Sequence, residues 1–246
     1  MLTNRLAREG DWLFRHRSFL PLVMIPPLGW SLLHEHNYLG GSHNLQHAWG
    51  TICCIVSWLG LLIRATTVGF VPGGTSGRNT RVQRATELNT TGWYSVTRNP
   101  LYLGNYVIGL GFASAWMDPL LILTFTAAFW LYYERIIARE EQFLTAEFGT
   151  VYLDWTARTP VFFPALRRWT PPAYSFCWRT VLRREYSAVL LIGIGYELID
   201  VIEHFLVDHR TYLDPSWSWH LVVCSVWFVA LRTIKKRTSW LRVAGR

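Results

Sequence analysis

Charged residues are scarce in this sequence. Asp, Glu, Lys and Arg together make up 16% of its 246 residues, whereas 51% are hydrophobic and 14 are Trp. A soluble domain of this length usually carries more charge. The composition therefore argues against a soluble bundle of buried helices and favours a protein that resides in a membrane.

Several familiar signals of function are also missing. The four cysteines have no metal-site spacing and imply no disulfide framework; they are Cys53, Cys54, Cys177 and Cys224. The loop at residues 72–77 is rich in glycine but lacks the spacing of either common nucleotide-binding motif. We therefore interpret this loop as a connector, which leaves the apolar runs as the main signal.

Six apolar runs are candidates for transmembrane helices, each of which needs about 17–25 mostly apolar residues. They are Ser18–Leu33, Leu45–Ile63, Leu101–Trp116, Leu120–Tyr133, Ser187–Leu206 and Trp217–Ile234. Pro26-Pro27 interrupts the first run and no small-residue cleavage pattern follows it, so we expect a retained helix rather than a removed signal peptide. The predicted fold class is an all-α, polytopic integral membrane protein with about six transmembrane helices.

Proline and glycine punctuate the middle of the chain. Pro100 suits the first turn of a helix, and Asp118-Pro119 predicts a turn so short that the helices on either side are antiparallel neighbours. The returning helix has no breaker before Phe148, and Gly149 is a natural stop. We expect residues 159–186, which contain four prolines, to form an irregular linker.

Basic residues fall almost entirely on one side of the six predicted spans. That side holds both termini and the loops that follow the second and fourth spans, and Arg210 is the exception on the other side. The positive-inside rule therefore places both termini in the cytoplasm. The net charge of +8 mainly reflects this topology. It also favours an anionic bilayer surface as a partner, whereas nucleic acid is not an expected partner.

Two motifs flank the third and fourth predicted spans. The first reads Arg98-Asn99-Pro100-Leu101-Tyr102-Leu103-Gly104, and the second contains Glu140-Glu141, Phe148-Gly149, Tyr152 and the segment Arg158–Pro164. This arrangement, over about residues 50–165, resembles the superfamily of membrane methyltransferases that includes isoprenylcysteine carboxyl methyltransferase and phospholipid methyltransferases. The resemblance implies methyl transfer from S-adenosylmethionine to a membrane lipid or a lipidated acceptor, at a site that faces the cytoplasm.

The resemblance also implies roles for individual residues. Catalytic roles fall on Arg98, Glu141 and Arg158, and cofactor binding falls on Asn99, Pro100, Tyr102, Gly104, Glu140, Glu141 and Tyr152. Members of the superfamily usually have His where this chain has Asn99, and Trp155 replaces a common Tyr. Because the cofactor carries an α-ammonium, a carboxylate such as Glu141 or Glu140 suits it. Methyl transfer of this kind does not require a metal.

Arginines next to the motifs suggest the acceptor. We expect Arg78, Arg81, Arg84 and Arg158 to bind the substrate, because guanidinium groups match phosphate oxygens in a bidentate fork. A phosphate headgroup is therefore favoured over an amine. The segment Gly74–Gly104 is most similar to the bacterial lipid A phosphate methyltransferase branch, which implies a location in the bacterial inner membrane.

Two alternatives remain open at this point. One is a NADPH-dependent sterol-type reductase, which has a similar carboxy-terminal fold and a related Arg-x-x-x-Tyr-x-Gly motif. The other is a non-enzymatic small transporter or scaffold, for which the intramembrane residues Glu197 and Asp200 argue. We divide the chain into an interfacial segment with the first span (1–44), a methyltransferase core (45–165), and a linker with a C-terminal two-span unit (166–246).

Histidines gather in the half of the sequence predicted to be non-cytoplasmic. They are His34, His36, His43, His47, His204, His209 and His220. Glu197, Asp200, Glu203 and His204 share one helix face, which we expect to meet the His-rich first loop. A hydrogen-bonded packing cluster is the favoured interpretation, and a metal site is the alternative.

Overall fold

The computed structural model describes residues 25–32, 37–73 and 87–245. Its helices are α2 (Ile25–Leu32), α3 (His43–Phe70), α4 (Trp93–Val96), α5 (Pro100–Ala115), α6 (Pro119–Phe148), α7 (Thr150–Thr156), α8 (Trp178–Asp208) and α9 (Pro215–Arg237), with short 3₁₀ turns η2 (Leu39–Gly41) and η3 (Leu166–Arg168). These residues contain no β-strand beyond one isolated bridge between Gly92 and Thr170. The all-α prediction is confirmed.

Three helices, α3, α6 and α9, are long and apolar enough to cross a membrane. The predicted run at residues 101–116 forms α5, which has only 16 residues, and the run at 187–206 lies inside the acidic helix α8. The first run is described only from residue 25 onward, as α2. The chain is thus an all-α polytopic membrane protein, while the count of six spans stays a prediction.

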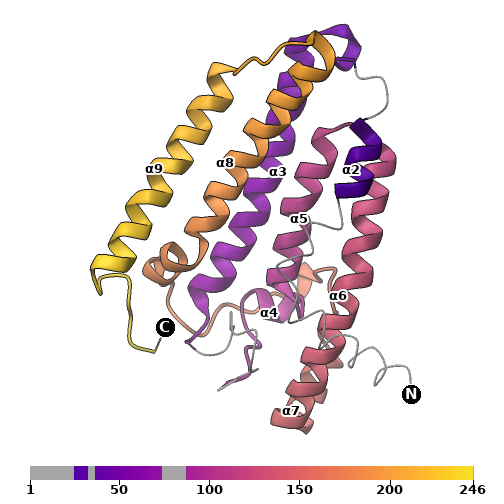
Figure 1. Ribbon diagram of the computed structural model, residues 1–246. Coiled ribbons are helices and arrows are strands. Elements are labelled where there is room, and N and C mark those ends of the chain that lie inside the picture. Colours follow the sequence, from indigo (N-terminus) through magenta and orange to yellow (C-terminus); the bar gives the residue numbers. More distant parts are fainter. Residues whose placement is uncertain (1–24, 33–36, 74–86, 246) are drawn as a thin grey trace.

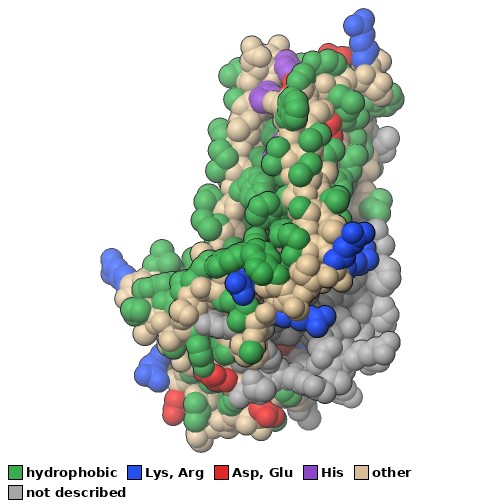
Figure 2. Space-filling model, turned by 90° about the vertical axis from the view of Figure 1, so that its left-hand side faces the viewer, with side chains coloured by type: hydrophobic (Ala, Val, Ile, Leu, Met, Phe, Trp, Pro, Cys, Tyr) green, Lys and Arg blue, Asp and Glu red, His purple; other side chains and the backbone are tan. Residues whose placement is uncertain are grey.

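The long helices lie side by side in one bundle (Figure 1). Helix α3 packs on α5 and on α8, α9 packs on α8, and α6 packs on α5. Figure 2 shows hydrophobic side chains over the long helices and most Lys and Arg side chains towards the end that carries α7. Exposed Ile, Leu, Val, Phe and Trp side chains on α3, α8 and α9 fit contact with lipid tails.

The predicted helix ends in the middle of the chain are confirmed. Helix α5 begins at Pro100, and α6 ends at Phe148 before Gly149, whose φ of +55° favours glycine. Asp118 caps α6 by accepting hydrogen bonds from the backbone amides of Leu120 and Leu121. Its other carboxylate oxygen accepts from the Ser31 hydroxyl at 2.6 Å, which ties α2 to the turn.

The linker prediction is wrong over its last nine residues. The chain is irregular from residue 159 to residue 177 apart from η3, but α8 already begins at Trp178. Pro171-Pro172 is the last breaker, so nothing prevents a helix over the polar stretch that precedes the apolar run. The helix therefore extends the predicted span at Ser187 back toward the two motifs.

Glycines set the distance between α3 and α5. A Cβ on Gly60 would lie 2.7 Å from the Gly104 carbonyl oxygen and 2.7 Å from the Ile108 amide nitrogen. A Cβ on Gly111 would lie 2.6 Å from the Cys53 carbonyl oxygen. The two backbones are therefore in direct contact, as small residues allow in membrane helices.

We expect Gly60→Ala to destabilise the fold by about 1–3 kcal/mol, because the new methyl group would meet backbone atoms that cannot rotate away. Gly50→Ala is the matched control on the same helix, since its Cβ would meet only the Trp217 ring at 3.4 Å. Equilibrium unfolding in mixed detergent micelles would measure both variants. Equal stabilities for the two variants would contradict the tight backbone contact.

Candidate active site

Arg98 joins three segments at the end of the bundle that carries α7. It lies between α4 and α5, and its Nη1 donates to Oε1 of Glu141 on α6 at 2.6 Å. Its Nε donates to the Thr159 carbonyl oxygen at 2.9 Å, and its backbone N–H donates to the Pro160 carbonyl oxygen at 2.9 Å. The first motif is thus fixed to both parts of the second motif.

Asn99 and its neighbours form the start of α5. The Asn99 carbonyl oxygen accepts from the amides of Tyr102 and Leu103, while its side-chain Nδ2 donates to the Val161 carbonyl oxygen at 2.9 Å. Thr97, which sequence reasoning missed, donates its hydroxyl to the Phe162 carbonyl oxygen at 2.8 Å. Only the fold brings these positions together, so no signal in the sequence could have identified Thr97.

A second contact between the motifs lies one turn further along α5. The Tyr102 hydroxyl donates to Oε1 of Glu140 at 2.6 Å, and the Tyr102 ring lies 4.5 Å from the Tyr133 ring, measured between centroids. The neighbouring carboxylates Glu140 and Glu141 of α6 therefore contact two residues of the first motif that are four positions apart, Tyr102 and Arg98. Each ionised carboxylate has about four acceptor positions, so Glu140 and Glu141 retain capacity for further donors.

Helix α7 places two aromatic residues behind the Arg98–Glu141 pair. Tyr152 is buried, and burial raises the pKa of its hydroxyl above the ordinary value. The negative charge of Glu141 raises this pKa further and Arg98 opposes it, so the phenol stays neutral near pH 7. Trp155 donates its indole N–H to the Tyr94 carbonyl oxygen at 3.1 Å, which is a structural contact.

The arrangement suits a ligand that carries an ammonium group. The Glu141 side chain is 32% exposed and the Arg98 side chain is 18% exposed, so the carboxylate is shielded but reachable. Two carboxylates, a tyrosine hydroxyl and an asparagine amide within two helix turns match the polar groups of the amino-acid end of S-adenosylmethionine. The residues present therefore fit this cofactor.

The other predicted site residues differ in their surroundings. Pro100 and Gly104 are buried, and a Cβ on Gly104 would meet the Arg64 side chain at 2.5 Å, so Gly104 faces α3. Arg158 is exposed, and its Nε donates to the Asp154 carbonyl oxygen at 3.2 Å. The structure thus shows no Arg158 contact with the Arg98–Glu141 pair. Three predicted substrate residues lie outside the described part of the chain: Arg78, Arg81 and Arg84.

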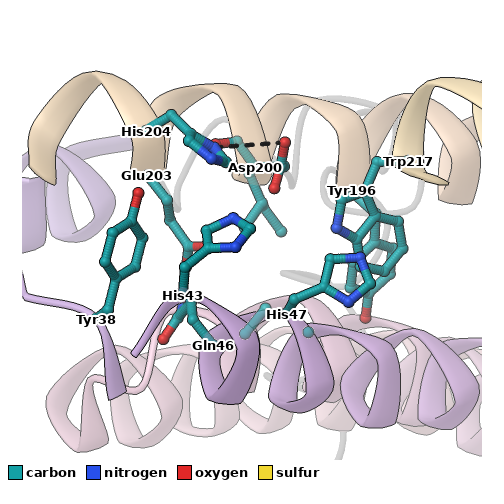
Figure 3. Close-up of a pocket in the computed structure, with 12 residues that line it drawn as sticks. Tyr38, His43, Gln46, His47, Tyr196, Asp200, Glu203, His204 and Trp217 are labelled. Atoms are coloured by element: carbon teal, nitrogen blue, oxygen red, sulfur yellow. Dashed lines mark hydrogen bonds and ion pairs between the residues drawn. The ribbon is translucent and has the colours of Figure 1, made fainter. Parts of the chain in front are cut away.

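A second polar cluster lies at the opposite end of the bundle, and its prediction is confirmed. Gln46 donates to Glu203 at 2.6 Å, and His204 Nδ1 lies 3.5 Å from Oδ2 of Asp200. Figure 3 shows His43 directed from α3 toward these side chains of α8, around a cavity of about 20 Å³. This volume has room for about one water molecule.

Hydrogen bonds satisfy only part of this cluster, because among the described residues Glu197 Oε2 and Asp200 Oδ2 are buried without a hydrogen-bond partner. On the same face of α8, Glu197 accepts from the Ser218 hydroxyl at 3.0 Å. Among the described residues, no group of three or more His, Cys, Asp or Glu side chains is arranged to hold a metal ion. His34 and His36, which belong to the first loop, lie outside the described residues.

Comparisons with known proteins find similarity in the region that contains the two motifs. The family model of phospholipid methyltransferases matches residues 45–151, which contain the Arg98–Glu141 and Tyr102–Glu140 contacts. The chain is also 31% identical over 80 residues to the protein-S-isoprenylcysteine O-methyltransferase of Xenopus laevis, over 32% of this chain and 28% of that protein. No solved structure matches the chain.

Two bacterial relatives carry other names. The cobalt-zinc-cadmium resistance protein CzcN of Cupriavidus metallidurans is 30% identical over 217 residues, which cover 83% of this chain and 88% of the relative. The nickel-cobalt-cadmium resistance protein NccN of Alcaligenes xylosoxydans xylosoxydans is 38% identical over 84 residues, which cover 34% of this chain and only 39% of the relative. With the motif contacts and the family model, these matches show that the chain belongs to the superfamily of membrane methyltransferases that includes the phospholipid methyltransferases and isoprenylcysteine carboxyl methyltransferase.

Proposed function

We propose that this chain is a S-adenosylmethionine-dependent methyltransferase that acts on a membrane lipid headgroup or a lipidated acceptor, with a phosphate headgroup favoured. The observation that carries the proposal is the pair of contacts Arg98–Glu141 and Tyr102–Glu140. Both lie inside the region that matches the phospholipid methyltransferase model. They support the proposal because two neighbouring carboxylates suit a cationic group of the cofactor.

In the proposed reaction, the residues of the chain bind the cofactor and orient it toward the acceptor. When bound, S-adenosylmethionine supplies the methyl group from its sulfonium. Glu141 holds the α-ammonium, while Tyr102 and Asn99 hold polar groups of the amino-acid end or the ribose. The aromatic layer of Tyr106, Phe129 and Phe162 packs beside them and limits access of water. Alignment and exclusion of water are the main requirements of an in-line displacement.

The positive charge of the arginines near the motifs indicates the chemical class of the methyl acceptor. A phosphate monoester carries about −1.5 to −2 charges near pH 7 and is already ionised, so its methylation needs no general base. The arginines that precede the first motif and Arg158 favour such a group over an amine. The sterol-type reductase alternative rests on a similar carboxy-terminal fold and on the first motif, whereas the family model extends into the second motif.

The two metal-resistance relatives suggest the cellular role. Methylation of a phosphate monoester removes one ionisable oxygen and leaves a single negative charge. A membrane surface with less charge attracts divalent cations more weakly. We therefore propose that this modification contributes to tolerance of cobalt, zinc or cadmium. A deletion strain should grow more poorly with these metals, and wild-type protein but not a Glu141→Gln variant should restore growth.

The direct test is methyl transfer by the purified protein to phosphatidic acid and to phosphatidylethanolamine, side by side. We expect a product one methyl group heavier from phosphatidic acid and little or none from the amine lipid. Activity only on phosphatidylethanolamine would overturn the phosphate assignment but keep the methyltransferase. Binding of NADPH without binding of S-adenosylmethionine would instead support the reductase.

A further inference from the structure

A buried ion pair lies beside the candidate site but outside both motifs. Arg64 on α3 and Glu185 on α8 form three hydrogen bonds: Nε to Oε2 at 3.0 Å, Nη2 to Oε1 at 2.9 Å and Nη2 to Oε2 at 2.8 Å. The side chains are 17% and 5% exposed. An apolar pair is often at least as stable as a buried ion pair, so stability alone does not explain this one.

The pair continues into a line of polar contacts. The Arg64 Nη1 donates to Oδ1 of Asn105 on α5, and the Asn105 Nδ2 donates to the Tyr133 hydroxyl oxygen on α6 at 3.0 Å. The Tyr133 ring packs on Tyr102, which in turn donates to Glu140. The line therefore runs from α8 through α3 and α5 to a carboxylate of the candidate site.

The chemistry of the groups fixes the direction of this line. A guanidinium only donates hydrogen bonds, so the Asn105 oxygen must face Arg64 and the Asn105 amide hydrogens must face Tyr133. If the guanidinium turned away, the Asn105 amide would be free to reverse. The Tyr133 oxygen would then lose its donor. The carboxylate of Glu185 holds the guanidinium in the one orientation that prevents this.

Gly104 of the first motif makes the route possible. A Cβ at this position would lie 2.5 Å from Cγ of Arg64 and 3.3 Å from its Cδ. The aliphatic part of Arg64 therefore crosses α5 where the motif provides no side chain. A motif glycine and an arginine from the preceding helix thus form one unit.

We propose that Glu185 is a positioning residue of the candidate site, which it controls through Arg64, Asn105 and Tyr133. Helix α8 lies beyond the region that matches the family model, which ends at residue 151. On this proposal the C-terminal helices complete the site rather than only anchoring it. The part that concerns activity rests on the proposed methyl transfer, while the part that concerns geometry does not.

The test compares Glu185→Gln with Glu197→Gln in the full-length protein. Glu197 is the matched control because it is buried on the same helix and bonded to Ser218, far from the motifs. The ¹⁹F NMR resonance of 3-fluorotyrosine incorporated at position 102 reports the surroundings of the Tyr102 ring. Its measurement does not depend on catalytic activity. We expect Glu185→Gln, but not Glu197→Gln, to shift this resonance and to lower kcat about tenfold to a hundredfold.

The outcomes separate the two proposals. An unshifted resonance in Glu185→Gln overturns the positioning role, whatever the activity. If Glu185→Gln shifts the resonance and the wild-type protein transfers no methyl group, the proposed function is overturned and the positioning role is kept. If Glu185→Gln does not fold, the double variant R64M/E185L replaces the pair by apolar side chains and should fold. That variant should show the same shift, and a wild-type resonance and kcat would overturn the proposal.

Discussion

Replacing Arg98 with Met should produce the largest loss of stability of any single change at the site. The variant loses two charge-assisted hydrogen bonds, to Glu141 and to the Thr159 carbonyl oxygen, in a largely buried setting. Each such bond contributes about 1.5–3 kcal/mol when buried. Because the Glu141 side chain is 32% exposed, solvent screening reduces the share of its bond, and we expect a decrease of about 2–4 kcal/mol in the free energy of unfolding. Equilibrium unfolding in mixed detergent micelles measures this decrease.

Two further variants sharpen this experiment. Arg98→Lys keeps the charge but not the fork, so it should recover only part of the stability. Arg210→Met is the control, since Arg210 is exposed at the other end of the bundle, and it should change stability by less than about 0.5 kcal/mol. If Arg98→Met matched this control, the first motif would not depend on the Arg98 side chain for its attachment to α6 and Thr159.

Glu141→Gln should weaken binding of S-adenosylhomocysteine about tenfold to a hundredfold. The loss follows from removal of the charge that would hold the α-ammonium, which contributes about 1.5–3 kcal/mol. Gln keeps the size of the side chain and one oxygen for Arg98, so the fold should be retained. Isothermal titration calorimetry on the purified protein gives the affinity directly.

Glu147→Gln provides the control for this prediction. Glu147 lies on the same helix, less than two turns further along, and is exposed. Its replacement should leave the affinity unchanged. Equal affinities in the Glu141 and Glu147 variants would remove Glu141 from the cofactor site, and Glu140 would become the residue to replace.

Local signals in the sequence predicted the parts of the fold that depend on local chemistry. Pro100 begins α5 and Gly149 ends α6 because these residues restrict or relax the backbone wherever they occur. The polar face of α8 that meets Gln46 was also predicted, since charges in a span require partners. The start of α8 at Trp178 was not, because a polar helical extension lacks the apolar pattern of a span.

Contacts across helices were beyond the reach of the sequence. The motifs indicated that residues near 98 and 141 belong together, and the Arg98–Glu141 hydrogen bond agrees. Nothing local indicated that Arg64 pairs with Glu185, which is 121 positions away. Arg64 reads as one more cytoplasmic basic residue under the positive-inside rule. Its partner becomes visible only when α3, α5 and α8 are packed together.

The glycine contact between α3 and α5 has a mechanical consequence. Backbones that touch at Gly60 and Gly111 cannot slide past one another without a clash, so these two helices behave as a rigid frame. Helix α6 rests on that frame through aromatic rings, with Phe125 lying over Gly109. Rings pack more adaptably than backbone atoms do. We therefore expect the movement that admits the proposed lipid substrate at α6, which carries Glu140 and Glu141, and at α7, while α3 and α5 stay fixed.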